Sequence, residues 1–455
     1  MNTSSTVSPT SDSSTHPQTE TSGLKGAFAN LSPKLQRCVQ EAGYTTPTPI
    51  QEQSIPIVSA GKDLMGTAQT GTGKTAAFTL PILQRLEANP QKVHKGSPRV
   101  LILAPTRELA AQIGESIETY GKFLSLKHAV IFGGVNQFHQ VKKLNQGLDI
   151  LVATPGRLLD LMQQGYIRLN KVEIFVLDEM DRMLDMGFIR DIKKVLKDIP
   201  QERQTLFFSA TMSNQIEQLA STMVRNPDRV SITPDEPTVD RIDQKVMFIN
   251  SGHKNAMLVK LVGGRDVDKV IVFTQMKHAA NKVVEKLTEA GIRAVAIHGN
   301  KSQAARIKAL DGFKRGRFQV LVATDVAARG LDVDDITHVI NYDMPVEAET
   351  YVHRIGRTAR AGAEGDAISF VSPEDRAYLT QVEKLLGSEI PIDLEQEFHS
   401  DEARYSTMKP KVPGRGRNGG GRGRNNNRSR NKPSARRGRQ SGGGGGGGKR
   451  RSWGR

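Results

Sequence analysis

The sequence of 455 residues has a single cysteine, one tryptophan and no long apolar run. The lone Cys38 excludes an internal disulfide framework and a cysteine-based metal cluster, which indicates a reducing compartment and predicts a small buried side chain. A membrane span needs about 20 consecutive apolar residues, so we expect a soluble chain with no membrane partner. A chain of this length favours two folded domains plus some unfolded sequence.

Acidic residues are absent from the end of the chain. Residues 403–455 carry 17 lysines and arginines without one aspartate or glutamate, while the preceding 402 residues hold 47 basic and 48 acidic residues. This segment also contains 15 of the 43 glycines, and too little apolar surface to offset the entropy of ordering it. We predict a disordered basic Arg/Gly-rich tail over 393–455 that binds polyanions electrostatically; a solubilising tail without a partner is the alternative.

The remaining sequence predicts an α/β fold used twice. Short apolar runs alternate with helical patterns, as in parallel sheets buried on both faces. We expect one domain over 24–232, a proline-containing linker over 233–243, and a second domain over 244–392. Residues 1–23, rich in Ser, Thr and Pro, predict a disordered leader and do not resemble a secretory signal. The expected strands are 100–104, 129–132, 150–153, 174–178 and 205–209, then 270–274, 294–298, 320–324, 338–342 and 367–371.

The sharpest local pattern is Ala68-Gln-Thr-Gly-Thr-Gly-Lys-Thr75, between a short apolar run and a predicted helix. Such loops direct backbone N–H groups at phosphate oxygens, with Lys74 serving the β and γ phosphates and the Thr75 hydroxyl able to bind Mg²⁺. A chance glycine-rich turn is the alternative. The predicted nucleotide contacts are Ala68, Gln69, Thr70, Gly71, Thr72, Gly73, Lys74 and Thr75.

A pair of carboxylates follows the apolar run that ends at Leu177. In Asp178-Glu-Met-Asp181, we expect Asp178 to hold Mg²⁺ and Glu179 to orient and deprotonate the attacking water in phosphoryl transfer. A solvated acidic helix start would share this composition. The upstream phosphate loop favours catalysis on a nucleoside triphosphate with Mg²⁺ as cofactor.

The segment His353-Arg-Ile-Gly-Arg-Thr-Ala-Arg-Ala-Gly362 places cationic side chains on a glycine-punctuated stretch of the second domain. We expect Arg357 and Arg360 to reach the γ-phosphate as arginine fingers. A solvated basic turn is the alternative.

In this order along the chain, these segments resemble the DEAD-box ATP-dependent RNA helicases, from about residue 28 to 372. The resemblance implies two RecA-like domains that clamp ATP and single-stranded RNA. It implies that Gln51, in Gly43-Tyr-Thr-Thr-Pro-Thr-Pro-Ile-Gln51, reads the adenine edge and that Phe28 stacks on the adenine ring. It assigns Asp325 and Asp332 to the ATP site of the second domain, with Asp332 at the ribose.

The same resemblance implies contacts to the RNA backbone and residues that couple hydrolysis to strand separation. Such contacts hold a strand without reading its bases, and a bent strand would give local melting of short duplexes. The implied RNA contacts are Pro105, Thr106, Arg107, Gly133, Gly134, Thr154, Pro155, Gly156, Arg157, Arg306 and Thr324. The implied coupling residues are Asp181, Ser209, Thr211 and His353.

Three positions depart from the family pattern. Met180 replaces alanine between the carboxylates, where it adds bulk, Ala359 replaces a glycine between the finger arginines, and Phe28 lies close to the Gln51 segment. Because the acids remain, we predict retained ATPase activity with altered coupling.

We therefore expect an RNA-dependent ATPase that unwinds short duplexes or remodels RNA–protein complexes, with a monomeric core. A DNA helicase and a clamp or chaperone with little unwinding are the alternatives. The short leader and Arg-Gly tail most resemble the bacterial RhlE-type subgroup, which implies cytoplasmic work on ribosomal or messenger RNA.

Overall fold

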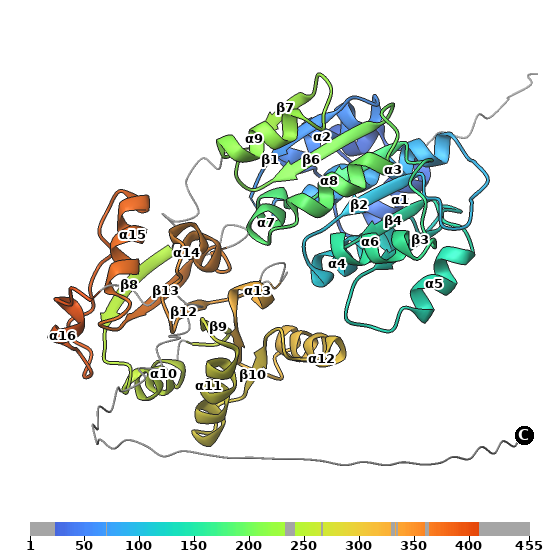
Figure 1. The fold of residues 1–455 in the computed structure, drawn as a ribbon. Coiled ribbons are helices and arrows are strands. Elements are labelled where there is room, and N and C mark those ends of the chain that lie inside the picture. The colour runs from blue at the N-terminus through green and yellow to red at the C-terminus, as the bar shows by residue number, and fades with distance from the viewer. Residues whose placement is uncertain are drawn as a thin grey trace, which may run out of the picture. The chain divides into compact units, whose positions relative to one another are not determined.

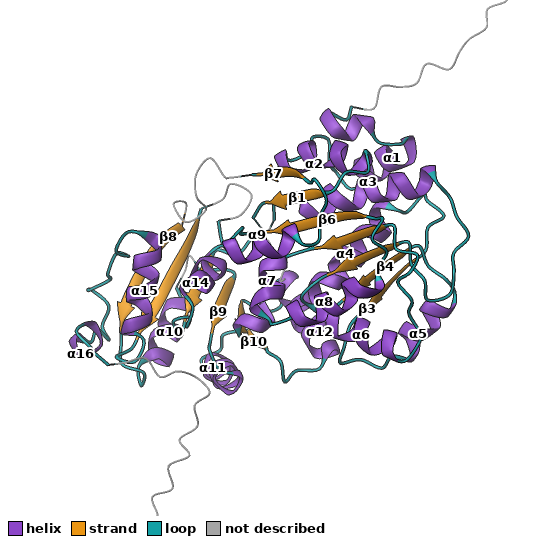
Figure 2. Cartoon of the chain, turned by 45° about the horizontal axis from the view of Figure 1, so that its top comes forward, coloured by secondary structure: helices purple, strands orange, loops and turns teal. Residues whose placement is uncertain are grey.

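The computed structural model describes residues 23–69, 71–232, 242–264, 267–328, 333, 335–359 and 364–408. These residues form two α/β lobes, each built on its own sheet (Figure 1). All strand pairings within both sheets are parallel, as the strands of Figure 2 illustrate. The predicted fold of two tandem parallel-sheet domains is confirmed.

The first sheet has the strand order β3-β4-β2-β5-β6-β1-β7. Its strands are β1 Leu64–Thr67, β2 Val100–Leu103, β3 His128–Ile131, β4 Ile150–Ala153, β5 Ile174–Leu177, β6 Gln204–Ser209 and β7 Asp228–Ser231. Its helices are η1 Gly26–Asn30, α1 Pro33–Glu41, α2 Pro49–Ser59, α3 Lys74–Ala88, α4 Arg107–Tyr120, α5 Phe138–Asn145, α6 Pro155–Gln163, α7 Met180–Asp185, α8 Ile189–Asp198 and α9 Asn214–Ser221.

The second sheet has the order β10-β11-β9-β12-β13-β8. Its strands are β8 Ile242–Phe248, β9 Val270–Phe273, β10 Ala294–Ile297, β11 Val320–Ala323, β12 His338–Asn341 and β13 Gly365–Val371. Its helices are α10 Lys254–Val262, α11 Lys277–Glu289, α12 Gln303–Lys314, α13 Asp325–Ala328, α14 Ala348–Ile355, α15 Arg376–Leu386 and α16 Asp401–Arg404.

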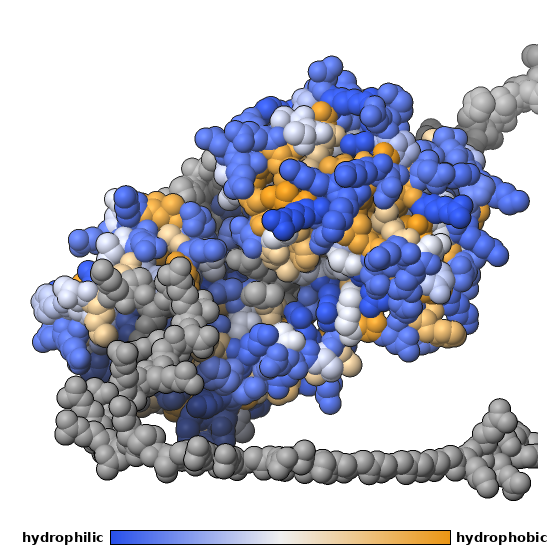
Figure 3. All heavy atoms as spheres, in the orientation of Figure 1, coloured by the Kyte–Doolittle hydropathy of each residue, from blue (hydrophilic) through white to orange (hydrophobic). Residues whose placement is uncertain are grey.

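Each sheet is buried on both faces, which explains why its strands are continuously apolar. Val100 and Ile102 of β2 pack into one core of the first lobe, while Leu101 and Leu103 pack into another on the opposite face. Alternation along a strand sends successive side chains to opposite faces. The surface seen in Figure 3 is mostly hydrophilic, with apolar side chains gathered on part of the first lobe.

Two predicted boundaries need correction. Strand β8 begins at Ile242, so the predicted linker 233–243 overlaps the second sheet, and its residues 233–241 lie outside the described residues. The folded chain also continues past residue 392. Asp393 donates its backbone N–H to Val246, Gln396 binds the carbonyl of Phe248, and α16 follows, so the tail predicted from 393 begins inside the folded lobe.

The remaining predictions concern Cys38, membrane-spanning helices and the two terminal segments. Cys38 is 1% exposed, as predicted for a small apolar side chain. No helix among the described residues combines the length and hydropathy required to cross a bilayer. The predicted leader, apart from Gly23, and the tail from residue 409 lie outside the described residues.

Candidate nucleotide and RNA sites

The predicted site residues of the first lobe gather where its strands end. Strands β3, β4 and β2 are neighbours, and the segments after them begin the implied RNA-binding stretches at Phe132, Thr154 and Ala104. Strands β5, β6 and β1 are the next neighbours, and they lead into the carboxylates, the Ser209 segment and the phosphate loop. Because the strands are parallel, all these segments lie at one edge of the sheet, which we call the carboxyl edge.

The phosphate loop connects β1 to α3 and is held by side chains from the start of α2. Gly71 and Gly73 have φ angles of 88° and 91°, which favour glycine. The hydroxyl of Thr48 donates to the carbonyl of Thr72 at 2.8 Å, and Nε2 of Gln51 donates to the carbonyl of Gly73 at 3.2 Å. A side chain at Gly73 would collide with Gln51. The backbone angle thus favours glycine here, and a side chain would also displace the Gln51 amide from its contact.

Lys74 and Asp178 form the buried centre of this edge. Lys74 is 6% exposed and donates from Nζ to the carbonyl of Ala68 at 2.6 Å. Asp178 is 2% exposed, and burial raises its pKa to about 7, against the lowering influence of Lys74. Within the described part of the chain, its Oδ1 atom is buried without a hydrogen-bond partner. A buried carboxylate oxygen with no donor suits a divalent cation, so the residues present fit the expected Mg²⁺.

Glu179 is paired with an arginine outside the residues predicted from the sequence. Glu179 is 4% exposed with a left-handed φ of 55°, and its Oε2 accepts from the guanidinium of Arg182 one turn along α7. Arg182 is itself 6% exposed. The i,i+3 spacing was a signal available in the sequence. Met180 lies between them with no exposed surface, inside the core that includes Met183.

Asp181 connects the carboxylate segment to the end of β6. Its Oδ2 accepts from the backbone N–H groups of Ala210 and Thr211, both at 3.2 Å, and from the Thr211 hydroxyl at 3.4 Å. Its own N–H donates to the hydroxyl oxygen of Ser209 at 3.3 Å. The structure therefore brings together three of the four residues expected to couple hydrolysis to RNA.

Phe28 does not have the placement expected of an adenine-stacking ring. It is 1% exposed and packs with Leu31 and Leu35 in the first-lobe core. Stacking on a base requires an open ring face, and this conformation offers none. The expectation for Phe28 is therefore corrected: its visible role is to anchor η1.

In the RNA half of the carboxyl edge, the Thr106 hydroxyl caps a helix and two arginines lie against loops. Thr106 caps α4 by accepting from the N–H of Leu109 at 3.2 Å, and Arg107 is the first residue of that helix. Gly134 has a φ of 76°, which disfavours any residue other than glycine, and its Cα lies so close to the guanidinium of Arg107 that an added Cβ would displace that side chain. Pro105 is buried in the same stretch, and Gly133 is partly exposed.

Arg157 holds the loop that follows Gly134. Its guanidinium donates to the carbonyl of Val135 at 3.2 Å and to Oε1 of Gln137 at 3.4 Å. Thr154 precedes α6, whose first residue is Pro155, and a Cβ added to Gly156 would meet nothing within 4 Å. These contacts join the three RNA-binding stretches implied for the first lobe into one surface.

In the second lobe, Asp325 is engaged by a residue outside the predicted set. Arg354 is 1% exposed and binds both carboxylate oxygens of Asp325, at 2.6 and 2.9 Å. It also donates to Oδ1 of Asn341 at 3.1 Å and to the carbonyl of Asp343 at 2.6 Å. Arg354 thus ties α14 to the ends of β11 and β12, a structural role that the sequence could not distinguish from that of neighbouring arginines.

The finger segment follows α14. Arg357 is 5% exposed and donates from Nε to the carbonyl of His353 at 3.2 Å. Ala359 has a φ of 53°, the left-handed region that a glycine would occupy without strain. Thr324 follows β11, and Arg306 lies on α12. Three predicted site residues, Thr70, Asp332 and Arg360, lie outside the described residues.

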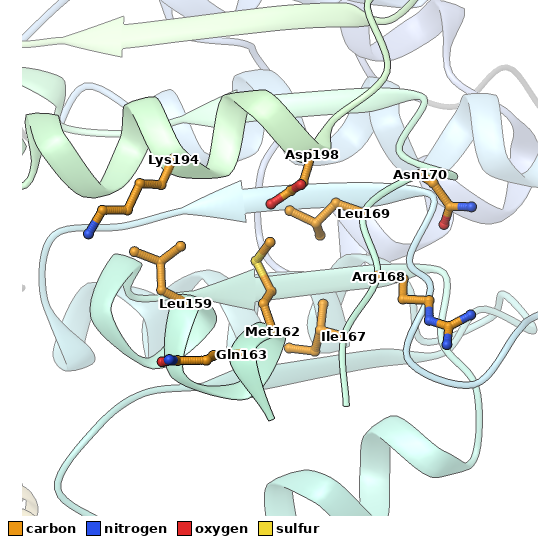
Figure 4. A pocket seen from close by; sticks show the side chains of 9 residues that line it. All are labelled: Leu159, Met162, Gln163, Ile167, Arg168, Leu169, Asn170, Lys194 and Asp198. Carbon is orange, nitrogen blue, oxygen red and sulfur yellow. The ribbon is translucent and has the colours of Figure 1, made fainter. Parts of the chain in front are cut away.

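A groove elsewhere in the first lobe, of about 630 Å³, contains none of the predicted site residues. Figure 4 shows it between α6 and α8, with an aliphatic floor and charges of both signs around it. Its lining residues are Leu159, Met162, Gln163, Ile167, Arg168, Leu169, Asn170, Lys194 and Asp198. Its floor lacks the aromatic rings and phosphate-binding backbone of a nucleotide site.

Comparison with known proteins agrees with this geometry. Residues 48–219 match the DEAD/DEAH box helicase family, and residues 253–362 match the helicase conserved C-terminal domain. ATP-dependent RNA helicase CshA of Limosilactobacillus reuteri is 42% identical over 362 residues, covering 80% of this chain and 72% of the relative. ATP-dependent RNA helicase RhlB of Pseudomonas syringae is 42% identical over 366 residues, covering 79% and 92%.

A solved structure titled S. cerevisiae Dbp5 bound to RNA and ADP BeF3 is similar with a TM-score of 0.70 and 33% identity. The similarity covers 80% of this chain and 94% of that one, and both lobes have the RecA-like fold. Since the family matches span both lobes and curated relatives are 42% identical over most of their length, the chain belongs to the DEAD-box RNA helicase family.

Proposed function

We propose that this chain is an ATP-dependent RNA helicase that hydrolyses ATP at the phosphate loop and grips the RNA backbone at the other half of the same edge. The observation that carries the proposal is the set of contacts from Asp181 to Ser209, Ala210 and Thr211, between the carboxylates and the neighbouring strand end. A change at the phosphates can therefore alter α7 and the Ser209 segment together. The relatives named above act on or bind RNA according to their names, which supports RNA as the ligand.

The proposed chemistry assigns a task to each buried charge. Lys74 would leave the carbonyl of Ala68 for the β and γ phosphates, and Thr75 and Asp178 would hold Mg²⁺. When bound, Mg²⁺ supplies charge neutralisation to the transferred phosphoryl group. Glu179 would accept the proton of the attacking water. Arg357 and Arg360, with His353 as a coupling residue, would complete the site from the second lobe.

RNA would be held through its backbone, which makes recognition independent of sequence. The arginines and glycines at the ends of β2, β3 and β4 support this, because they offer guanidinium groups and closely approached backbone. We also propose local melting of short duplexes, RhlE-type work on ribosomal or messenger RNA, a monomeric core and a cytoplasmic location. The Arg-Gly repeats at 414–417 and 421–424 support the RhlE-type placement.

The test is phosphate release by the full chain with single-stranded RNA, with single-stranded DNA and with neither. RNA alone should stimulate the rate, and Lys74→Ala should abolish the stimulation. Lys62→Ala is the matched control, since Lys62 is a 61% exposed lysine of the same lobe that pairs with Asp228. Strand separation of a short RNA duplex is measured in the same samples.

Each result has a defined meaning. Equal stimulation by DNA would contradict RNA specificity and favour a DNA translocase. RNA-stimulated hydrolysis without strand separation would contradict the helicase step and favour an ATP-dependent clamp. Loss of activity in Lys62→Ala as well would show that general damage, and not the phosphate loop, explains the Lys74 result.

A further inference from the structure

The first turn of α5 presents an aromatic ring to solvent beside the implied RNA surface. Phe138 is 65% exposed, and it is the only phenylalanine among the exposed large apolar side chains of the described residues. Its backbone N–H donates to Oδ1 of Asn136 at 2.9 Å, which fixes the start of the helix. The loop that leads to it is held by Arg157 through Val135 and Gln137. The ring is therefore placed by the residues that are expected to grip RNA.

Three further exposed side chains surround this position: His139, Lys142 and Lys143. We call these residues, together with Phe138, the α5 patch. The rings of Phe138 and His139 lie 5.5 Å apart in an edge-to-face arrangement of 82°. Each lysine follows one ring by four residues, which places ring and cation on the same side of a helix. Residues 121–148 contain no aspartate or glutamate, so nothing in this stretch neutralises the lysines.

We propose that the α5 patch binds a nucleotide of the RNA strand immediately outside the segment gripped at the ends of β2, β3 and β4. Phe138 stacks on the base, and Lys142 and Lys143 contact the adjoining phosphates. Stacking uses the π-face that every base has, and lysines read only charge. The patch therefore extends the footprint on RNA without adding sequence preference. This inference rests on the proposed RNA function.

The combination of features distinguishes the patch from ordinary surface. A single exposed apolar residue needs no explanation, and two adjacent lysines on a helix need none either. Here the ring, the cations and the absence of acids coincide with a loop that Arg157 and Arg107 contact. A ring beside two exposed lysines suits a polyanion whose units carry planar bases, and continuity with the backbone grip favours RNA as that polyanion.

The first experiment compares oligoribonucleotides bound by the full chain with a nonhydrolysable ATP analogue. One oligonucleotide spans only the gripped segment, a second extends it by a few nucleotides at each end, and a third carries abasic riboses in the extensions. Wild type should bind the second oligonucleotide more tightly than the first and third. Phe138→Ala and Phe138→Leu should each weaken only the second complex, by about five- to tenfold, whereas Phe138→Trp should retain it.

A spectroscopic readout follows from the single tryptophan of the chain, Trp453. In a Trp453→Phe background, Phe138→Trp provides one fluorophore at the patch. Its emission should be quenched by the extended oligonucleotide and unaffected by the abasic one. Quenching that is equal for both oligonucleotides, or absent, would overturn the stacking role. Leucine that binds as well as phenylalanine would overturn it too.

The lysines are tested separately by salt dependence. Replacing Lys142 and Lys143 with glutamine should flatten the slope of log affinity against log salt by about 1.4, at about 0.7 per lost phosphate contact on single strands. The matched control is Lys193→Gln with Lys197→Gln, both exposed on α8. An equal slope in both double variants would overturn the lysine contacts. If wild type binds no RNA at all, the proposed function fails; if only the extension has no effect, this inference fails alone.

Discussion

The two halves of the carboxyl edge in the first lobe are built differently. In the nucleotide half, Lys74, Asp178 and Glu179 are each less than 7% exposed. In the RNA half, Arg107 and Gly134 are accessible, and the α5 patch is open. Charge stabilisation in a reaction is strongest when groups are desolvated and fixed before the substrate arrives. Holding a backbone needs only complementary groups near the surface. We therefore expect that substitutions can impair ATP hydrolysis and RNA binding independently.

The largest separation should come from Glu179→Gln. Loss of the general base should lower the RNA-stimulated turnover number by about 10² to 10⁴, because the amide cannot accept the proton of water. The affinities for ATP and for RNA should remain within about twofold of wild type. Steady-state phosphate release measures the turnover number, and equilibrium binding measures the affinities for ATP and RNA. If Glu179→Gln hydrolysed ATP at the wild-type rate, Glu179 would not be the general base. The proposed difference between the two halves would then lack support in the nucleotide half.

Met180→Ala should lower the stability of the protein without changing the neighbouring carboxylates. Met180 has no exposed surface, and truncation of a buried methionine costs about 2 to 5 kcal/mol through lost burial and a cavity. Denaturant unfolding measures the change. Met276→Ala, at a methionine that is 47% exposed, should change the free energy of unfolding by less than about 0.5 kcal/mol. Equal stability of the two variants would show that Met180 is not a packing residue.

Arg107→Ala should affect the RNA half alone. Removing one charged donor to a phosphate should weaken RNA binding about tenfold, in line with the strength of charge-assisted hydrogen bonds. Affinity for ATP in the absence of RNA should not change. Arg37→Ala removes an exposed arginine paired with Glu41 in the same lobe and serves as the control. A parallel loss of ATP affinity in Arg107→Ala would mean that the halves are not separable in the free protein.

The charge of Asp178 should appear as a pH dependence of stability in the nucleotide-free, metal-free protein. Its pKa rises from 3.8 to about 7 on burial, so the folded state binds this proton more tightly than the unfolded state. The contribution of Asp178 to the free energy of unfolding should fall as pH increases between about 4 and 7, and level off above. Asp178→Asn should lack this component. Parallel stability curves for the two proteins would contradict the burial of the charge.

The smallest effect is expected in the second lobe. Ala359→Gly should raise the free energy of unfolding by about 1 kcal/mol, because an L-residue at φ of 53° carries a steric cost that glycine avoids. Thermal unfolding measures it. Ala348→Gly at the start of α14 should instead destabilise, since glycine lowers helix propensity. Stabilisation by both substitutions would rule out the backbone angle as the cause.

Much of the fold could be predicted from the sequence, for a definite reason. Strands covered on both faces must be continuously apolar, so Val100–Leu103, Ile150–Ala153 and Val320–Ala323 were found within one residue of their limits. The edge strand β7 was missed because its sequence, Asp228–Ser231, has a single buried residue. Strand β8 was also missed, and one reason is that its first residues alternate in burial.

The candidate site was predicted in its residues but not in its pairings. Spacing identifies Asp178 and Glu179 because the strand delivers them, and the i,i+3 spacing also allows Arg182 to pair with Glu179. Only the tertiary structure shows that Arg354 binds Asp325. The sequence also cannot distinguish an exposed aromatic ring from a buried one. Phe28 and Phe138 are the same residue type, yet one is 1% exposed and the other 65%. Only packing separates a core anchor from a surface that can meet a base.

The hydrogen bonds from Thr48 and Gln51 to the backbone of Thr72 and Gly73 have a consequence for the thermodynamics of nucleotide capture. A loop already fixed by its neighbours gives up little conformational entropy when a ligand arrives, so more of the gross interaction appears as affinity. A nucleotide that displaced Gln51 toward its own base would release part of this restraint. The identity of the bound base would then determine how freely the phosphate loop moves around the phosphates.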